Sequence, residues 1–270
     1  MRELEREFLE DDSACPSGSL RRGHVLAIVG AGRLGTALTG ALRGALPALE
    51  WEFAGPFGRG YDGRGADAVL LCVPDAEIAA AAKLVRRGPL VGHCSGATSL
   101  DVLAPHEGYS FHPLLPVIPG RTDFAGAGAA IAGTTTRALA FAASLAGALG
   151  MRATQIAEED RTAYHAAASI ASNFLVTLEA AAEQLATTAG ISRELLAPLV
   201  RATVENWAAL GPERALTGPV ARGDEATVAA QRTAVAERIP ELLPLFDELV
   251  AATRALSAHA APSEPEVAAA

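Results

Sequence analysis

Positive charge is scarce in this sequence. Its 22 lysines and arginines are outnumbered by 31 aspartates and glutamates, which leaves a formal net charge of -9 at pH 7. No run of lysine and arginine is longer than two residues, so nothing would offset repulsion from a phosphate backbone. We therefore expect no nucleic-acid partner.

Long apolar runs and paired cysteines are also missing. No apolar stretch is long enough to cross a bilayer without charges or helix breakers. The first twelve residues are strongly acidic, unlike the basic-then-apolar order of a signal peptide. The three cysteines, Cys15, Cys72 and Cys94, are widely spaced and contain no CxxC pair, which favours reduced thiols. We expect a cytoplasmic protein with no membrane partner.

The chain divides into two compositional regimes between two tails. Residues 23–157 alternate short β-type runs (25–29, 68–73, 90–94, 109–114, 129–132 and 153–156) with helical patterns (34–46, 76–87 and 134–149). This alternation predicts an α/β Rossmann domain, with a mostly parallel, doubly wound sheet. Residues 158–258 have no strand pattern and predict an all-helical domain. Residues 1–22 and 259–270 are predicted to be disordered tails.

A glycine-rich turn follows the first predicted strand and opens a helix: Gly30-Ala31-Gly32-Arg33-Leu34-Gly35. This is the context that the dinucleotide-binding fingerprint requires. Gly30 would permit the tight turn, Gly32 would let the backbone approach a pyrophosphate, and Gly35 would allow close packing of helix on strand. The N–H groups at the start of the helix, at Arg33 and Leu34, would face the anion. The alternative is a Rossmann shape that has lost its ligand.

The residues after the second predicted strand favour NADP over NAD. We expect that strand to end near residues 53–55, where proteins that prefer NAD usually offer a carboxylate to the ribose. Residues 53–60 contain no carboxylate but include Arg59, which could accommodate a 2′-phosphate. The alternative for Arg59 is a solvated loop charge. In the next loop, Val73 and Pro74 would lie beneath the nicotinamide.

Polar residues follow the next three strands, where ligands bind in open α/β sheets. We expect Asp75 to cap the helix behind it, and Ser95 to expose its hydroxyl and backbone N–H to a carboxylate. His93 and His112 would converge on the substrate, or each could be a hydrogen-bonded structural residue. Nothing marks a lowered pKa for Cys94. His93, Cys94 and His112 are poorly spaced for a metal, so we expect none.

A polar stripe crosses the first long helix of the helical domain. His165, Ser169 and the pair Ser172/Asn173 are spaced i, i+4 and i+7/i+8, so they share one face. The small residues beside them indicate tight packing, and we expect this stripe to be buried. Buried polar groups need partners, which a substrate could supply. The alternative is local hydrogen bonding to the backbone or across a helix interface.

These motifs together resemble a bacterial family that joins a Rossmann-like domain to a helical domain of unknown function. The resemblance covers about residues 24–256 and rests on GAGRLG (30–35), LLCVPD (70–75), GHCSGA (92–97), SFHPL (110–114), YHAAASIASN (164–173) and LTGPVARGD (216–224). The family is similar to pyrroline-5-carboxylate reductases and prephenate dehydrogenases. All belong to the wider superfamily that shares a 6-phosphogluconate-dehydrogenase-like C-terminal domain.

The resemblance implies roles for some residues and a difference at another. In β-hydroxyacid dehydrogenase relatives, a Ser–Gly pair binds the substrate carboxylate, and Ser95-Gly96 matches it. Those relatives carry a catalytic lysine with an asparagine one turn later. Here His165 most resembles the lysine position, Ser169 follows one turn later, and Asn173 lies a further turn on. His112-Pro113 resembles the His–Pro step of prephenate dehydrogenases, whose substrate is again a carboxylate. The resemblance also implies a homodimer formed through the helical domain.

We therefore hypothesise an NADP-dependent oxidoreductase acting on a small 2-oxo, hydroxy or imino acid, with ketopantoate-type reduction as one candidate. Ser95 would hold the carboxylate, His165 would act as general acid/base, and Asn173 would orient it or the substrate. The missing lysine keeps open a second class, a dinucleotide-sensing or scaffold protein without turnover. A third is an acyl-transfer enzyme dependent on Cys94.

Overall fold

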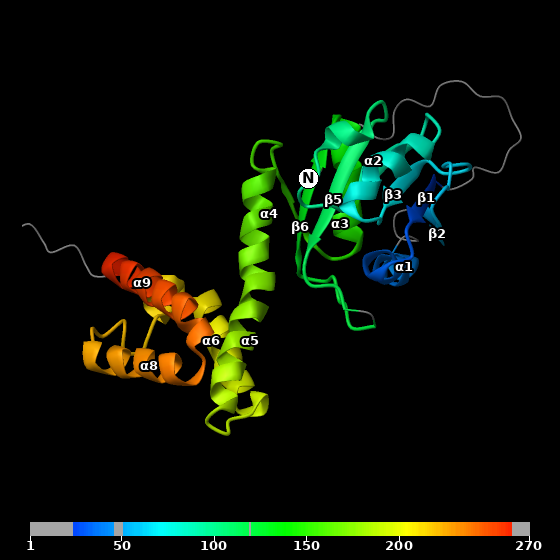
Figure 1. The fold of residues 1–270 in the computed structure, drawn as a ribbon. Helices are drawn as coiled ribbons and strands as arrows, with labels where there is room; N and C mark the ends of the chain where they lie inside the picture. Colours follow the sequence, from blue (N-terminus) through cyan, green and yellow to red (C-terminus); the bar gives the residue numbers. More distant parts are fainter. Residues whose placement is uncertain (1–23, 46–50, 119, 261–270) are drawn as a thin grey trace, which may run out of the picture. The chain divides into compact units, whose positions relative to one another are not determined.

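Short runs of alanine, valine, leucine and isoleucine form a seven-stranded sheet in the computed structural model, which describes residues 24–45, 51–118 and 120–260. The strand order is β2-β1-β3-β4-β5-β6-β7. The strands are β1 (His24–Val29), β2 (Trp51–Phe57), β3 (Ala68–Leu71), β4 (Leu90–His93), β5 (Gly108–Leu114), β6 (Gly128–Gly133) and β7 (Arg152–Gln155). Neighbouring strands are parallel except β5 and β6. The predicted mostly parallel sheet is confirmed (Figure 1).

Both faces of the sheet are covered by apolar side chains, as a doubly wound fold requires. Because side chains alternate along a strand, Leu26 and Ile28 of β1 pack in one cluster and Ala27 and Val29 in another. The first cluster contains residues of α1 (Arg33–Ala45) and α3 (Thr136–Ala148). The second contains residues of α2 (Asp75–Leu84) and of the short helix η3 (Leu100–Leu103). Tyr109 and Phe111 of β5 are the largest fully buried side chains of the first cluster.

The sheet contains a topological switch at β1. The chain passes from β1 to β2 on one side and then crosses to β3 on the other side of β1. In open α/β sheets, ligands bind beyond the carboxyl ends of the strands at such a switch. The glycine-rich turn follows β1 directly, so the fold places it at the expected position for a ligand.

A second unit consists of helices alone. It contains the π-helical turn η4 (Ile170–Phe174), α5 (Leu175–Thr187), α6 (Arg193–Leu210), α7 (Pro212–Ala215), α8 (Glu225–Arg238), η5 (Pro240–Leu242) and α9 (Leu243–Ala260). The predicted all-helical region is confirmed. None of the helices among the described residues is long and apolar enough to cross a membrane.

The boundary between the units lies later than the composition indicated. We expected it between residues 157 and 158, where the strand pattern ends, but the packing divides the chain between Ala168 and Ser169. Helix α4 (Arg161–Ser169) therefore belongs almost entirely to the sheet unit. The change in composition marks the end of the last strand, whereas the unit extends through α4, whose Arg161 and Tyr164 bond to residues of β5. The predicted tails lie mostly outside the described residues.

Candidate functional site

The glycine turn after β1 is built so tightly that two of its glycines have no room for a side chain. Gly30 has φ of +108°, and a Cβ there would overlap the carbonyl oxygen of Cys72. A Cβ at Gly35 would overlap the carbonyl oxygen of Gly30. Gly32 is different, because no atom lies within 4 Å of the position of its missing Cβ. The predicted steric roles of Gly30 and Gly35 are confirmed, and Gly32 leaves the backbone open to a ligand.

The start of α1 offers unpaired donors beside this turn. The helix begins at Arg33, and the N–H of Thr36 donates to the Gly32 carbonyl at 3.0 Å. The N–H groups of Arg33 and Leu34 belong to the first turn, where no intrahelical carbonyl can reach them. Gly32 and Arg33 are exposed. This end of the helix therefore fits an anion such as a diphosphate.

Arg59 lies two residues after β2 and is paired. The strand continues to Phe57, beyond the predicted end at residues 53–55, because Gly55-Pro56 is accommodated as a register shift against β1. Nη2 of Arg59 lies 3.0 Å from the carboxylate of Glu77, and the arginine side chain is 76% exposed. Such an exposed pair contributes little stability, so the guanidinium can exchange Glu77 for a phosphate.

Ser95 and Asp75 bond to each other, which changes the role expected for each. The Ser95 hydroxyl donates to Asp75 at 2.6 Å and accepts the N–H groups of Ala97 (3.2 Å) and Thr98 (2.9 Å). Ser95 is buried, so the prediction that its hydroxyl is exposed to a carboxylate was wrong. The predicted cap was also wrong, since Pro74 takes the N-cap position and Asp75 is the first helical residue. Together they hold the loop between β4 and η3 to the start of α2.

His93 is a structural residue. Its side chain is completely buried, and Nδ1 accepts the N–H of Ser95 at 3.2 Å. Burial, and after it the nearby charge of Arg161, lowers the pKa of His93 to about 4. The predicted convergence of His93 on a substrate is therefore wrong, and the hydrogen-bonded alternative holds.

His112 and His165 meet across Gly96, together with Tyr164. The Nδ1 atom of His112 lies 2.7 Å from the Tyr164 hydroxyl, and the His112 and His165 rings are 6.0 Å apart at an angle of 69°. A Cβ on Gly96 would lie 2.7 Å from Cδ2 of His165 and 2.9 Å from Cε1 of His112. The structure thus brings together two of the predicted site residues, and adds Tyr164, whose hydroxyl the sequence reasoning left without a role.

Arg161 is the buried charge of this cluster, and the sequence reasoning missed it. Its Nη2 donates to the Ser110 hydroxyl at 3.2 Å, and its Nε lies 3.3 Å from the carboxylate of Glu158. The arginine side chain is only 6% exposed. Its position one turn before His165 was a usable signal, since residues four apart share a helix face. That signal was outweighed because an arginine next to Glu158, Glu159 and Asp160 indicates a solvated ion pair at the start of a helix.

Burial keeps His112 and Tyr164 neutral near pH 7. Burial lowers the pKa of His112 to about 4, and the electrostatic effects of His165 and Arg161 act in the same direction, against Asp75. Burial raises the pKa of the Tyr164 phenol, an effect that Arg161 partly opposes. The contact between His112 and Tyr164 is thus a neutral hydrogen bond beside a fixed positive charge.

The predicted stripe does not continue past Ser169. Residues 170–174 form a π-helical turn, whose hydrogen bonds join residues five apart instead of four. The spacing that placed Ser172 and Asn173 on the face of His165 is therefore interrupted. Asn173 is exposed, so the expectation that it is buried was wrong.

Cys94 is buried and is not an activated thiol. Its hydrogen bond with Cys72 and its burial raise its pKa well above the ordinary value, whereas a nucleophilic cysteine needs a lowered pKa. This contradicts the acyl-transfer alternative. Within the described ranges, no group of three or more histidine, cysteine, aspartate or glutamate side chains could hold a metal ion.

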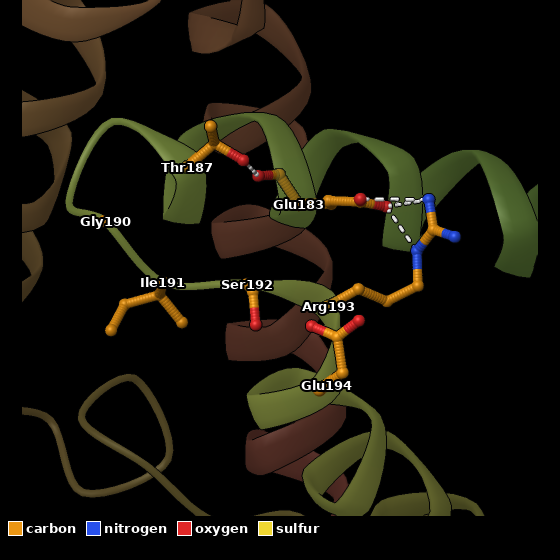
Figure 2. Close-up of a pocket in the computed structure, with 7 residues that line it drawn as sticks. All are labelled: Glu183, Thr187, Gly190, Ile191, Ser192, Arg193 and Glu194. Atoms are coloured by element: carbon orange, nitrogen blue, oxygen red, sulfur yellow. Dashed lines mark hydrogen bonds and ion pairs between the residues drawn. The ribbon is translucent and has the colours of Figure 1, made fainter.

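The helical unit carries an open hollow where α5 turns into α6 (Figure 2). It is lined by Glu183, Thr187, Gly190, Ile191, Ser192, Arg193 and Glu194. Arg193 makes two hydrogen bonds of 2.9 Å with the Glu183 carboxylate, as the dashed lines in Figure 2 show. The hollow's arginine is therefore already neutralised within the protein, and we assign it no site.

Comparison with known proteins finds one family model, which covers part of both units. Residues 128–253 match the model of a domain of unknown function, DUF2520. No curated protein matches the chain in sequence.

Three solved structures are similar in fold. A candidate NADP oxidoreductase from Bacteroides fragilis is 22% identical, with a TM-score of 0.70 over 87% of this chain and 99% of that chain. A protein from Thermotoga maritima is 25% identical, also with a TM-score of 0.70, over 87% and 98%. A pyrroline carboxylate reductase from Plasmodium falciparum with NADP bound is 12% identical, with a TM-score of 0.56 over 87% and 99%. They confirm the Rossmann-like fold with a helical C-terminal region.

Proposed function

We propose that the chain is an NADP-dependent oxidoreductase that reduces a small 2-oxo or imino acid or oxidises the corresponding product. The observation that carries this proposal is the glycine turn at the switch point. Gly30 and Gly35 leave no space for side chains there, and Gly32 leaves the backbone open. The cluster of His112, Tyr164 and His165 belongs to the same unit. The names of two structural neighbours, which mention NADP, agree with this reading.

NADP would be held by residues of the sheet unit. The turn from Gly30 to Gly35 would take the diphosphate on backbone N–H groups, including those of Arg33 and Leu34. Arg59 would exchange Glu77 for the 2′-phosphate. Val73 and Pro74, which follow β3, would support the nicotinamide. When bound, NADP supplies the hydride donor or acceptor.

The histidine cluster would hold the substrate and move a proton. His165 would donate the proton to the carbonyl oxygen or imine nitrogen, and accept it in the reverse direction. Tyr164 would hold the His112 ring in place through the hydrogen bond between its hydroxyl and the imidazole. Both imidazoles pack directly against Gly96, so a side chain at this position would displace them. The buried charge of Arg161 would attract a carboxylate, a task that the buried Ser95 hydroxyl does not perform. Ser95 would instead position the loop between β4 and η3 through its hydrogen bond to Asp75.

A titration with NADPH and NADH tests the cofactor assignment. We expect NADPH to bind more tightly, detected by energy transfer from Trp51 or Trp207 to the reduced nicotinamide. Arg59→Ala should weaken NADPH binding about tenfold, or about 1.4 kcal/mol, and leave NADH unchanged. Arg64→Ala is the matched control, because Arg64 is exposed in the same loop, 3.8 Å from Asp62. Equal losses in both variants, or no binding of either nucleotide, would refute the assignment.

The same preparations then test for turnover. NADPH oxidation is followed with a panel of 2-oxo and cyclic imino acids, ketopantoate included. We expect His165→Ala to lower kcat by about 10²–10⁴-fold, the usual contribution of a general acid, with NADPH affinity retained. Saturable NADPH binding without oxidation of NADPH by any member of the panel would favour the non-catalytic sensor instead.

We also propose that the helical unit forms a homodimer. No residue of α5 or α6 is buried, and the buried apolar residues of the second unit, among those described, are Val228 and Val235. Large apolar side chains of η4, α5 and α6 are instead exposed: Ile170, Phe174, Val176, Leu195, Leu199, Val204, Trp207 and Leu210. An apolar surface of this kind marks an interaction site.

The dimer can be tested by mass measurement in solution. We expect a dimer for the wild type by light scattering after size-exclusion chromatography. Leu199→Glu, on a side chain that is 65% exposed, should shift it to monomer because a charge would be buried without a partner. Leu84→Glu on the sheet unit, at a side chain 53% exposed, should not. A monomeric wild type would disprove the proposal.

A further inference from the structure

Two free thiols lie side by side beneath the glycine turn. Cys72 follows β3 and Cys94 follows β4. These strands are parallel neighbours in which Leu71 lies opposite His93. The residue that follows each of these two is a cysteine, so the cysteines lie side by side. The two sulfur atoms are 3.7 Å apart. Neither thiol has a part in the reaction proposed above.

We propose that Cys72 and Cys94 form a reversible disulfide when the protein meets a peroxide, and that this bond weakens dinucleotide binding. The formation of the bond stands on the geometry of the two thiols alone. Its effect on binding rests on the proposed function, because it concerns the same glycine turn.

The backbone already has the spacing that a disulfide needs. Neighbouring strands lie about 4.7–4.9 Å apart, which falls within the Cα separation of about 4.4–6.8 Å found in disulfides. The sulfurs must approach from 3.7 Å to a bond length of about 2.05 Å. Rotation of the two side chains, with a small shift of the loops, is enough to close this distance.

The reaction begins at Cys72, which is partly exposed, whereas Cys94 is buried. A peroxide oxidises the Cys72 thiol to a sulfenic acid and leaves as water or an alcohol. The Cys94 sulfur then attacks the Cys72 sulfur, the S–O bond breaks, and the hydroxyl leaves as water with the Cys94 proton. The two thiols together lose two electrons, which the peroxide takes up. Because its pKa is raised, Cys94 remains protonated, and this second step should be slow.

The turn cannot remain unchanged when Cys72 moves. The Cys72 N–H donates to the Val29 carbonyl at 2.7 Å, and Gly30 packs on the Cys72 carbonyl. The missing Cβ of Gly35 would lie only 3.3 Å from Cβ of Cys72. The shift of the Cys72 backbone that closes the disulfide is therefore transmitted to both glycines that shape the diphosphate site.

The test uses the full chain with Cys15→Ser, so that the two thiols are the only cysteines. Hydrogen peroxide should remove about 2 Da from the intact mass, the two hydrogens lost on disulfide formation, and peptide mapping should join residues 72 and 94. The Kd for NADPH should rise about tenfold and recover with dithiothreitol. Cys72→Ala and Cys94→Ala, each added to that background, should keep their affinity after peroxide treatment.

The outcomes separate this inference from the proposed function. Cysteines that remain reduced, or proceed to sulfinic acid without a linked peptide, would overturn the disulfide. A linked peptide with unchanged NADPH affinity would overturn its effect on binding. If the reduced protein does not bind NADPH, the proposed function and the effect on binding both fail, while the mass measurement still decides the disulfide.

Discussion

Gly35→Ala is expected to lower the affinity for NADPH at least about 100-fold, equivalent to about 2.7 kcal/mol. The new Cβ would overlap the Gly30 carbonyl oxygen and lie 3.3 Å from Cβ of Cys72. Helix α1 must then move away from the strand ends, or the turn must change its shape, and either change displaces the N–H groups that would bind the diphosphate. The strain should also lower the free energy of unfolding by about 1–3 kcal/mol. Titration of NADPH and urea unfolding measure the two effects.

Gly40→Ala is the matched control, because it adds the same methyl group to the same helix. Gly40 is exposed, and no atom lies within 4 Å of its missing Cβ. Alanine should therefore raise the free energy of unfolding by about 0.5–1 kcal/mol through helix propensity, with NADPH affinity unchanged. If the folded Gly35→Ala protein binds NADPH as well as the Gly40→Ala protein, the turn is not the diphosphate site.

The glycine turn could be predicted because its signal is local. Gly30 and Gly35 are required by contacts within a few residues and with the neighbouring strand, and the strand–turn–helix order is written in the sequence. The sheet was predictable for the same reason, since each buried strand is a short apolar run. β2 was the partial exception. It continues through Gly55-Pro56, residues that normally interrupt a strand, and it tolerates them because it lies at the edge of the sheet.

The site beyond the turn could be predicted only in part, because contacts across elements decide it. That β4 and β5 are neighbours explains why the sequence located His93 and His112 at one edge of the sheet. It did not distinguish them: His93 is completely buried and bonds to its own loop, whereas His112 faces Tyr164. The bond between Ser95 and Asp75 joins the loop after β4 to the first residue of α2, 20 residues away in sequence, and no local pattern reveals it.

Arg161 shows the same limit for charge. Its three acidic neighbours in sequence indicate a solvated helix start. The guanidinium is nevertheless buried, and it donates a hydrogen bond to Ser110, 51 residues away in sequence. The π-helical turn at 170–174 likewise has no signature in the hydrophobic spacing. Both features depend on how the helix is packed after it has formed.

Acid is expected to destabilise the protein strongly through His93 and His112. Both have a pKa of about 4 in the folded protein, below the ordinary value of 6.5. The unfolded chain therefore binds more protons between pH 6.5 and pH 4, so stability rises with pH through this window and is complete above it. Protonation of each histidine costs at most roughly 3 kcal/mol by pH 4. Urea unfolding at several pH values measures this slope.

The double variant His93→Gln/His112→Gln should lose most of this dependence on pH. His24→Gln is the control, because that imidazole is 70% exposed. The groups facing the two buried histidines are Arg161, His165, Asp75 and Glu158. Burial is the main reason that positive charge on either histidine opposes folding, and the charge of Arg161 adds to it, against the carboxylates. An unchanged slope in the double variant would show that acid acts elsewhere, and that these histidines are not held neutral by the fold.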